Sequence, residues 1–141
     1  MSTRSAIGVM HGDVCKAIYC HSDGYLSYNG KVLLEHYDSA KANHLVSMGD
    51  MSALGKVIGD KINFNDRMEY ATDNVATQCR FYGRDRDETG IEFKTFFNDQ
   101  ELFEGVDAEY FYVLKDGDWY VSEGNDWTLL SEALAKEMEA V

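Results

Sequence analysis

Hydrophobic and polar residues alternate along several short stretches of the chain, which is the pattern of strands with one buried face. Glycine and aspartate residues, which favour tight turns, separate these stretches. We therefore predict three hairpins, formed by residues 5–10 with 14–21, 78–82 with 91–97, and 108–114 with 118–121.

Other stretches carry hydrophobic residues three or four positions apart, as amphipathic helices do. Asp38 or Ser39 can cap the start of one such helix, and Gly49 can end it. The last helix is expected to pack on the core through a stripe formed by Trp127, Leu130, Leu134 and Met138. The predicted helices cover residues 31–37, 40–48, 99–103 and 128–139.

Hairpins that alternate with helices predict an α+β fold, with an antiparallel or mixed sheet built from three hairpins and helices packed on one face. The length of 141 residues suits a single domain, and a hydrophobic fraction of 45% can supply one core. Residues 52–55 are too few for more than one turn, and residues 56–74 give no clear prediction.

The net charge of −12 lies almost entirely in the second part of the chain. Residues 1–63 contain six basic and six acidic residues, whereas residues 64–141 contain seven basic and nineteen acidic ones. Such a negative field repels phosphate backbones and anionic lipids. We therefore expect no direct binding to nucleic acid and no association with membranes.

Cys15, Cys20 and Cys79 are an odd number of cysteines, which favours reduced thiols. The chain has no apolar stretch as long as a signal-peptide core or a membrane span. These two observations lead us to expect a cytoplasmic protein.

Residues 20–37 hold the densest group of side chains able to bind ligands or transfer protons, including two histidines, three tyrosines, one aspartate and one glutamate. They follow a predicted strand and lead into a predicted helix. Binding and catalytic side chains are often placed on such connections. This segment is therefore the first candidate site.

Several motifs lie in a fixed order: Met1–Ser5, Ile18-Tyr19-Cys20-His21-x-Asp23-Gly24-Tyr25 with Asn29-Gly30, Leu33-Leu34-Glu35-His36-Tyr37, Gly49–Gly55 and Phe81–Arg86. Together they resemble a family of small uncharacterised proteins of tailed bacteriophages and prophages. Many relatives have tryptophan where this chain has Ser22. The resemblance implies an accessory protein in the bacterial host cytoplasm that acts on a host pathway or a host defence.

The loop with Arg84 and Arg86 is the second candidate region, because guanidinium groups grip phosphate and carboxylate in a bidentate manner. If this loop meets residues 20–37, the tyrosines can stack a base while the arginines hold phosphate. The simpler alternative is that both arginines form salt bridges with neighbouring acids. The hypothesis is a non-catalytic protein that binds a small anionic, nucleotide-like ligand through His21, Asp23, Tyr25, Tyr28, Asn29, His36, Tyr37, Arg84 and Arg86.

Two alternative functions stay open. In the first, an acidic face imitates nucleic acid and inhibits a host protein through Asp107, Glu109, Asp116, Asp118 and Glu123. In the second, the protein is a small hydrolase or transferase centred on His21, which would need a carboxylate or a thiol within hydrogen-bond reach.

We predict no metal and no cofactor. Cys20, His21, His36 and Cys79 are zinc ligand types, but their spacing matches no zinc-binding pair. A homo-oligomer is a further possibility, because aromatic residues 110–112 alternate along a strand and would leave an exposed face for a partner.

Overall fold

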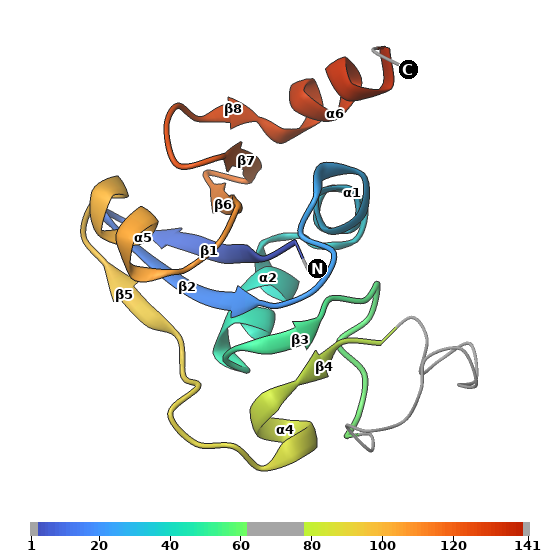
Figure 1. Ribbon diagram of the computed structural model, residues 1–141, viewed down its shortest axis with the longest axis vertical. Helices are drawn as coiled ribbons and strands as arrows, with labels where there is room; N and C mark the ends of the chain where they lie inside the picture. Colours follow the sequence, from blue (N-terminus) through green and yellow to red (C-terminus); the bar gives the residue numbers. More distant parts are fainter. Residues whose placement is uncertain (1–2, 62–77, 140–141) are drawn as a thin grey trace.

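The computed structural model describes residues 3–61 and 78–139, and within them one mixed sheet runs through the molecule (Figure 1). Its strands lie in the order β4-β3-β2-β1-β6-β7-β8, and β5 also pairs with β2. The strands are β1 (Ser5–His11), β2 (Val14–Cys20), β3 (Met51–Ala53), β4 (Arg80–Phe81), β5 (Lys94–Phe96), β6 (Tyr110–Lys115), β7 (Asp118–Ser122) and β8 (Thr128–Leu129).

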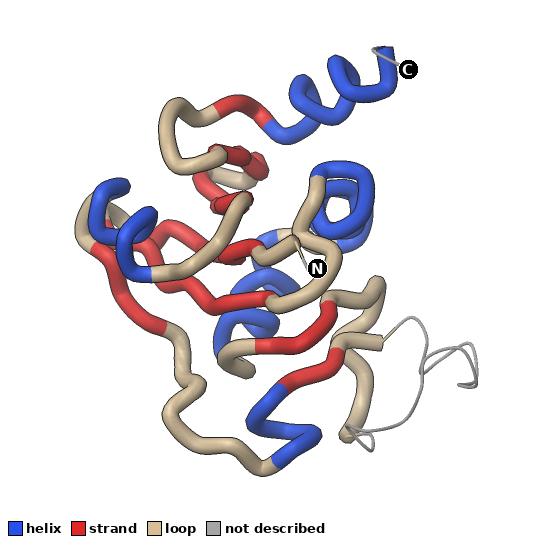
Figure 2. The backbone as a smooth tube through the Cα atoms, viewed as in Figure 1, coloured by secondary structure: helices blue, strands red, loops and turns tan. Residues whose placement is uncertain are grey.

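Helices lie in the β2–β3, β4–β5 and β5–β6 connections and after β8 (Figure 2). They are a π-helical turn η1 (Leu26–Gly30), α1 (Lys31–His36), α2 (Ser39–Ser47), α4 (Tyr82–Arg86), α5 (Asp99–Gly105) and α6 (Leu130–Glu139). The predicted α+β class is confirmed. No helix in the described ranges combines the length and the apolar composition that crossing a membrane would require.

Two of the three predicted hairpins are confirmed. Strands β1 and β2 pair antiparallel from Ser5↔Cys20 to His11↔Val14, and β6 pairs with β7 in the same way. A parallel pairing joins the two hairpins, because β1 lies beside β6 with Ser5 opposite Tyr110. This pairing and the parallel pairing of β2 with β3 make the sheet mixed, and β1 lies inside the sheet between β2 and β6.

The third predicted hairpin is wrong. Strand β4 pairs with β3, whereas β5 pairs with β2, so the two strands do not meet each other. The buried carboxylate of Asp85 accepts a hydrogen bond from the Phe81 backbone N–H (2.8 Å) and starts α4 where a strand was expected to continue. Strand β3 (Met51–Ala53) includes the first two residues of the stretch 52–55, which was expected to form no more than one turn.

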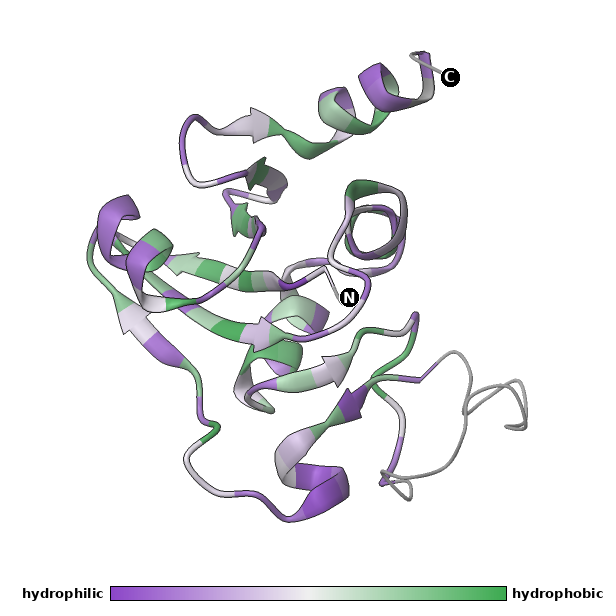
Figure 3. Ribbon diagram, viewed as in Figure 1, coloured by the Kyte–Doolittle hydropathy of each residue, from purple (hydrophilic) through white to green (hydrophobic). Residues whose placement is uncertain are grey.

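Helices cover both faces of the sheet, so the prediction of helices on one face is incomplete. Helices α1, α2 and α6 bury Leu33, Leu45 and Leu130 in the larger core. Helix α5 packs Leu102 against the opposite face, in a smaller core with Phe111. Consistent with this, β1 and β2 are largely hydrophobic in Figure 3, and most of α4 is hydrophilic.

The helix ends follow local chemistry that the sequence shows. The Asp38 carboxylate accepts from the Lys41 backbone N–H (2.9 Å) at the start of α2, and Asn98 caps α5 in the same way through the Glu101 N–H. Gly49, with φ +84°, ends α2. The last helix is confirmed as well, although β8 takes its first two predicted residues.

Candidate ligand-binding site

The turn at Gly24, inside the first candidate segment, connects three parts of the chain. The Gly24 N–H donates to the Thr3 carbonyl (2.8 Å), and its own carbonyl accepts from the Tyr112 hydroxyl (2.6 Å). A Cβ atom on Gly24 would lie 2.9 Å from the backbone carbonyl carbon of Arg4. Only glycine allows this approach, so the turn holds the N-terminal strand in place.

Asn29 stabilises the same turn. Its side chain is fully buried, and its amide nitrogen donates to Ser5 Oγ (3.2 Å) and to the Ser22 carbonyl (3.1 Å). The Asn29 N–H donates to the carbonyl of Asp23, which adopts a left-handed conformation (φ +57°). Both residues therefore fix the backbone between β2 and α1.

Tyr25 and Tyr28 are exposed, with 40% and 38% of their surface accessible. Their ring centroids lie 6.3 Å apart in a tilted pair. His36 is also exposed, and its Nε2 lies 3.9 Å from a Glu35 carboxylate oxygen. These three side chains are accessible to a ligand.

Tyr37 and Arg84 meet inside the protein, at Cys79. The buried Tyr37 hydroxyl donates to the Gly55 carbonyl (2.7 Å) and lies 3.2 Å from Cys79 Sγ, and burial raises its pKa. Arg84 Nη2 donates to the Cys79 carbonyl (3.0 Å). The two candidate segments therefore converge, but on the core.

Arg84 is committed to structural contacts. Only 13% of its side chain is exposed, and its guanidinium donates to both carboxylate oxygens of Asp85 and to the carbonyls of Ile58 and Gly59. Arg86 is exposed, forms an ion pair with Glu88 and lies over the Tyr82 ring (4.9 Å). The salt-bridge alternative describes both arginines.

His21 is exposed, and its Nδ1 lies 2.7 Å from the Tyr19 hydroxyl, with which it shares a hydrogen bond. Cys20 and Cys79 do not supply a nucleophile for it. Burial raises the pKa of Cys20 to about 12 and also raises the pKa of Cys79. Both thiols are therefore protonated near neutral pH, and the hydrolase alternative finds no activated thiol in them.

The five acids of the mimicry alternative are all exposed, and they divide between the two ends of the β6–β7 hairpin. Asp116 and Asp118 lie at the turn. Glu109 and Glu123 lie at the open end, where Glu109 and Asp107 form ion pairs with Arg4.

The aromatic residues 110–112 do not form the exposed face that was expected. Phe111 and Tyr112 are buried in the two cores on opposite faces of the sheet, because helices cover both faces. Tyr110 is half-buried and stacks on Tyr112 with a centroid distance of 6.2 Å.

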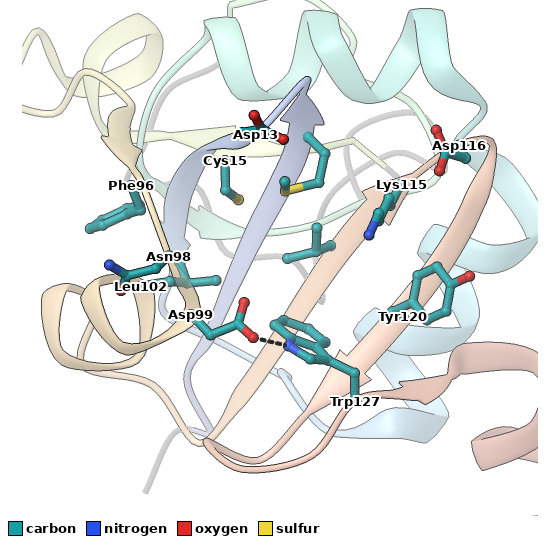
Figure 4. Close-up of a pocket in the computed structure, with 12 residues that line it drawn as sticks. Asp13, Cys15, Phe96, Asn98, Asp99, Leu102, Lys115, Asp116, Tyr120 and Trp127 are labelled. Carbon is teal, nitrogen blue, oxygen red and sulfur yellow. Dashed lines mark hydrogen bonds between the residues drawn. The ribbon is translucent and has the colours of Figure 1, made fainter.

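A groove of about 380 Å³ opens at the other end of the sheet (Figure 4). Helix α5 and strand β5 form one side, and β6, β7 and the β7–β8 connection form the other. Its apolar lining consists of Met10, Cys15, Phe96, Leu102 and Val113. Its aromatic and polar lining consists of Tyr120, Trp127, Asp13, Asn98, Asp99, Lys115 and Asp116.

The parallel pairing of β1 with β6 explains why these residues meet. Because the two strands run in the same direction, the turn after β1 and the turn after β6 lie at the same end of the sheet. The first turn carries Asp13 and the second carries Asp116. Gly8 on β1 leaves room for the Cys15 side chain, because a Cβ atom on Gly8 would lie 2.6 Å from Cys15 Sγ.

Asp99 is the best-defined polar group of the groove. Its Oδ2 accepts a hydrogen bond from the Trp127 indole N–H (3.0 Å), which links α5 to the β7–β8 connection (Figure 4). Cys15 lies in the groove floor. Burial, together with the Asp99 carboxylate, raises the pKa of Cys15 to about 12.

None of the nine predicted site residues lines this groove or a smaller cavity of about 250 Å³ beside Tyr19 and Asp107. Sequence reasoning missed the groove because its residues come from six separate helices and strands (β1, β2, β5, α5, β6 and β7) and from the connections beside them. It also placed Trp127 on the stripe of the last helix, whereas Trp127 precedes that helix and packs against the smaller core. The Asp116-Gly117 turn was predicted, but only as a turn and not as part of a groove.

Among the residues that the structure describes, no group of histidine, cysteine or acidic side chains is arranged to hold a metal ion. Comparisons with protein-family models, with curated proteins and with solved structures give no match to this chain.

Proposed function

We propose that the protein is a non-catalytic binding protein and that the groove is its ligand-binding site. The observation that carries this proposal is a cavity of about 380 Å³ with an apolar floor and a few polar groups at its rim. Small-molecule sites in proteins commonly have this size and composition. The groove also contains Trp127, whose indole ring offers a flat surface to an apolar ligand.

The chemistry of the groove supports binding rather than catalysis. Cys15 is its only cysteine, and a thiol with a pKa of about 12 is protonated near neutral pH. The Asp99 carboxylate is occupied in part by the Trp127 indole. Cys15 thus contributes an apolar surface, and Asp99 contributes a fixed negative charge.

The role of an accessory protein acting on a host pathway remains a prediction from the phage resemblance. In that setting the ligand would be a small molecule of the bacterial cell. A nucleotide-like anion also remains a prediction, but its proposed residues are poorly placed, since Asn29, Tyr37 and Arg84 are bonded within the protein. The groove is therefore the better-supported site.

Nuclear magnetic resonance with a neutral apolar probe, adamantane-1-methanol, tests the proposal. The two tryptophan indole N–H groups report separately, because Trp127 lines the groove and Trp119 is buried in the larger core, bonded to the Tyr37 carbonyl. We expect the Trp127 indole resonance to shift in a saturable manner while the Trp119 resonance stays in place.

A Trp119→Phe variant assigns the two resonances. Shifts of both indoles together, or no saturable shift of the Trp127 indole in folded protein, would contradict binding in the groove.

A further inference from the structure

We infer that the groove selects small organic cations, that is, ligands with a protonated amine on an apolar body. This inference rests on the proposed function and adds the chemical class of the ligand. It follows from the charges at the rim, the position of one carboxylate and the nature of the floor.

The rim of the groove is negative. It contains the carboxylates of Asp13, Asp99 and Asp116 and a single ammonium group, that of Lys115. The surrounding chain adds to this field, because residues 98–141 contain twelve acidic residues and two lysines. A field of this sign concentrates cations at the groove and repels phosphates and carboxylates.

Asp99 is positioned to hold the cation. Its Oδ2 bonds the Trp127 indole, and its other carboxylate oxygen points into the groove (Figure 4). The indole bond limits the rotation of the carboxylate, so less entropy is lost when a ligand binds. An ammonium group at this oxygen would also lie near the Trp127 ring, whose face attracts cations.

The floor requires an apolar body. Cys15, Leu102 and Val113 are buried and carry no charge that could bind a second polar group. The volume admits a compact hydrocarbon of ten carbon atoms, and the groove is bounded on two sides by α5 and the β6–β7 hairpin. A small molecule fits such a bounded cavity better than an extended chain does.

Lys115 opposes the bound cation and therefore gives the inference a second test. Its side chain extends toward the groove in Figure 4, so it weakens the attraction for an ammonium group and favours an anion. Removing this charge should improve the binding of cations.

The experiment compares three ligands of one shape: adamantane-1-methylammonium, adamantane-1-methanol and adamantane-1-carboxylate. Affinity is measured from the Trp127 indole shift at low ionic strength. We expect the ammonium to bind about five- to tenfold more tightly than the alcohol, and the carboxylate to bind most weakly. This advantage should decrease as salt is added.

Three variants locate the effect. Asp99→Asn keeps an oxygen for the Trp127 indole but removes the charge, so it should abolish the advantage of the ammonium over the alcohol. Lys115→Met should strengthen ammonium binding by about twofold or more. Asp118→Asn is the matched control, because Asp118 is an exposed acid of the same hairpin that does not line the groove.

The outcomes separate the two proposals. Equal binding of the ammonium and the alcohol, or an ammonium advantage that survives Asp99→Asn, would overturn the cation inference and leave the binding site standing. If none of the three ligands shifts the Trp127 indole of folded wild-type protein, the proposed function itself fails.

Discussion

Residues 20–37 and the groove differ in how the fold uses their chemical groups. The segment 20–37 contains many reactive side chains, but the Asn29 amide nitrogen and the Tyr37 hydroxyl form hydrogen bonds that hold the chain together. The groove contains few such side chains, yet Asp99 directs a carboxylate oxygen into an open cavity. A binding site is thus indicated by polar groups that face an open cavity, and not by the number of reactive side chains in one stretch of sequence.

Removing the guanidinium group of Arg84 should have the largest effect on stability. If the group serves a ligand instead of the fold, stability will not fall and the comparison fails. Arg84→Ala removes the guanidinium that donates to both oxygens of the buried Asp85 carboxylate. We expect the free energy of unfolding to fall by about 3–5 kcal/mol, measured by urea denaturation.

Arg86→Ala is the matched control, because Arg86 lies on the same short helix and is exposed. It should change stability by no more than about 1 kcal/mol. Equal losses of stability in the two variants would show that the buried contacts of Arg84 do not stabilise the fold more than the exposed contacts of Arg86 do.

Asn29→Ala tests whether the segment 20–37 is structural. It removes the donors to Ser5 Oγ and the Ser22 carbonyl from a fully buried site, so stability should fall by about 2 kcal/mol. Thermal or urea denaturation measures the change, with Ser27→Ala, an exposed position in the same turn, as control.

The same variant sharpens the comparison with the groove. Folded Asn29→Ala protein should bind adamantane-1-methanol as the wild type does, because Asn29 does not line the groove. Loss of binding in this variant would mean that the two regions act as one site.

The pH dependence of the reactivity of the Cys15 thiol should give the smallest of these effects. Because burial and the Asp99 carboxylate raise its pKa to about 12, alkylation of Cys15 by iodoacetamide should keep rising above pH 9 instead of levelling off. Peptide mass spectrometry of folded protein between pH 8 and 10.5 measures the rate at this residue.

The same shift affects stability. The folded state disfavours the thiolate, so this contribution to stability is complete below about pH 9 and is lost as the pH rises toward 12. Asp99→Asn should move the alkylation profile of Cys15 to lower pH. A plateau near pH 9 in the wild type would contradict the raised pKa.

The elements that sequence reasoning predicted well are those fixed by local chemistry. The turn before Asp118 requires residues with positive φ, which Asp116 and Gly117 supply, and Asp38 caps its own helix. Such signals lie within a few residues of the structure they determine.

The elements that it missed depend on distant partners. Strand β3 was not predicted, and β4 and β5 lie within predicted strands but do not pair with each other. Each has two or three residues and pairs with a strand elsewhere in the chain. The groove depends on the pairing of β1 with β6, which no short stretch of sequence reveals. Trp127 was misplaced because its spacing from Leu130 imitates a helix.

The pairing of Ser5 with Tyr110 also affects how the chain folds while it is synthesised on the ribosome. Strand β1 can pair with β2 early in translation, but its other edge stays unprotected until residues 110–115 have been synthesised. An open strand edge can join another nascent chain, so slow translation of the intervening segment prolongs the period in which aggregation competes with folding.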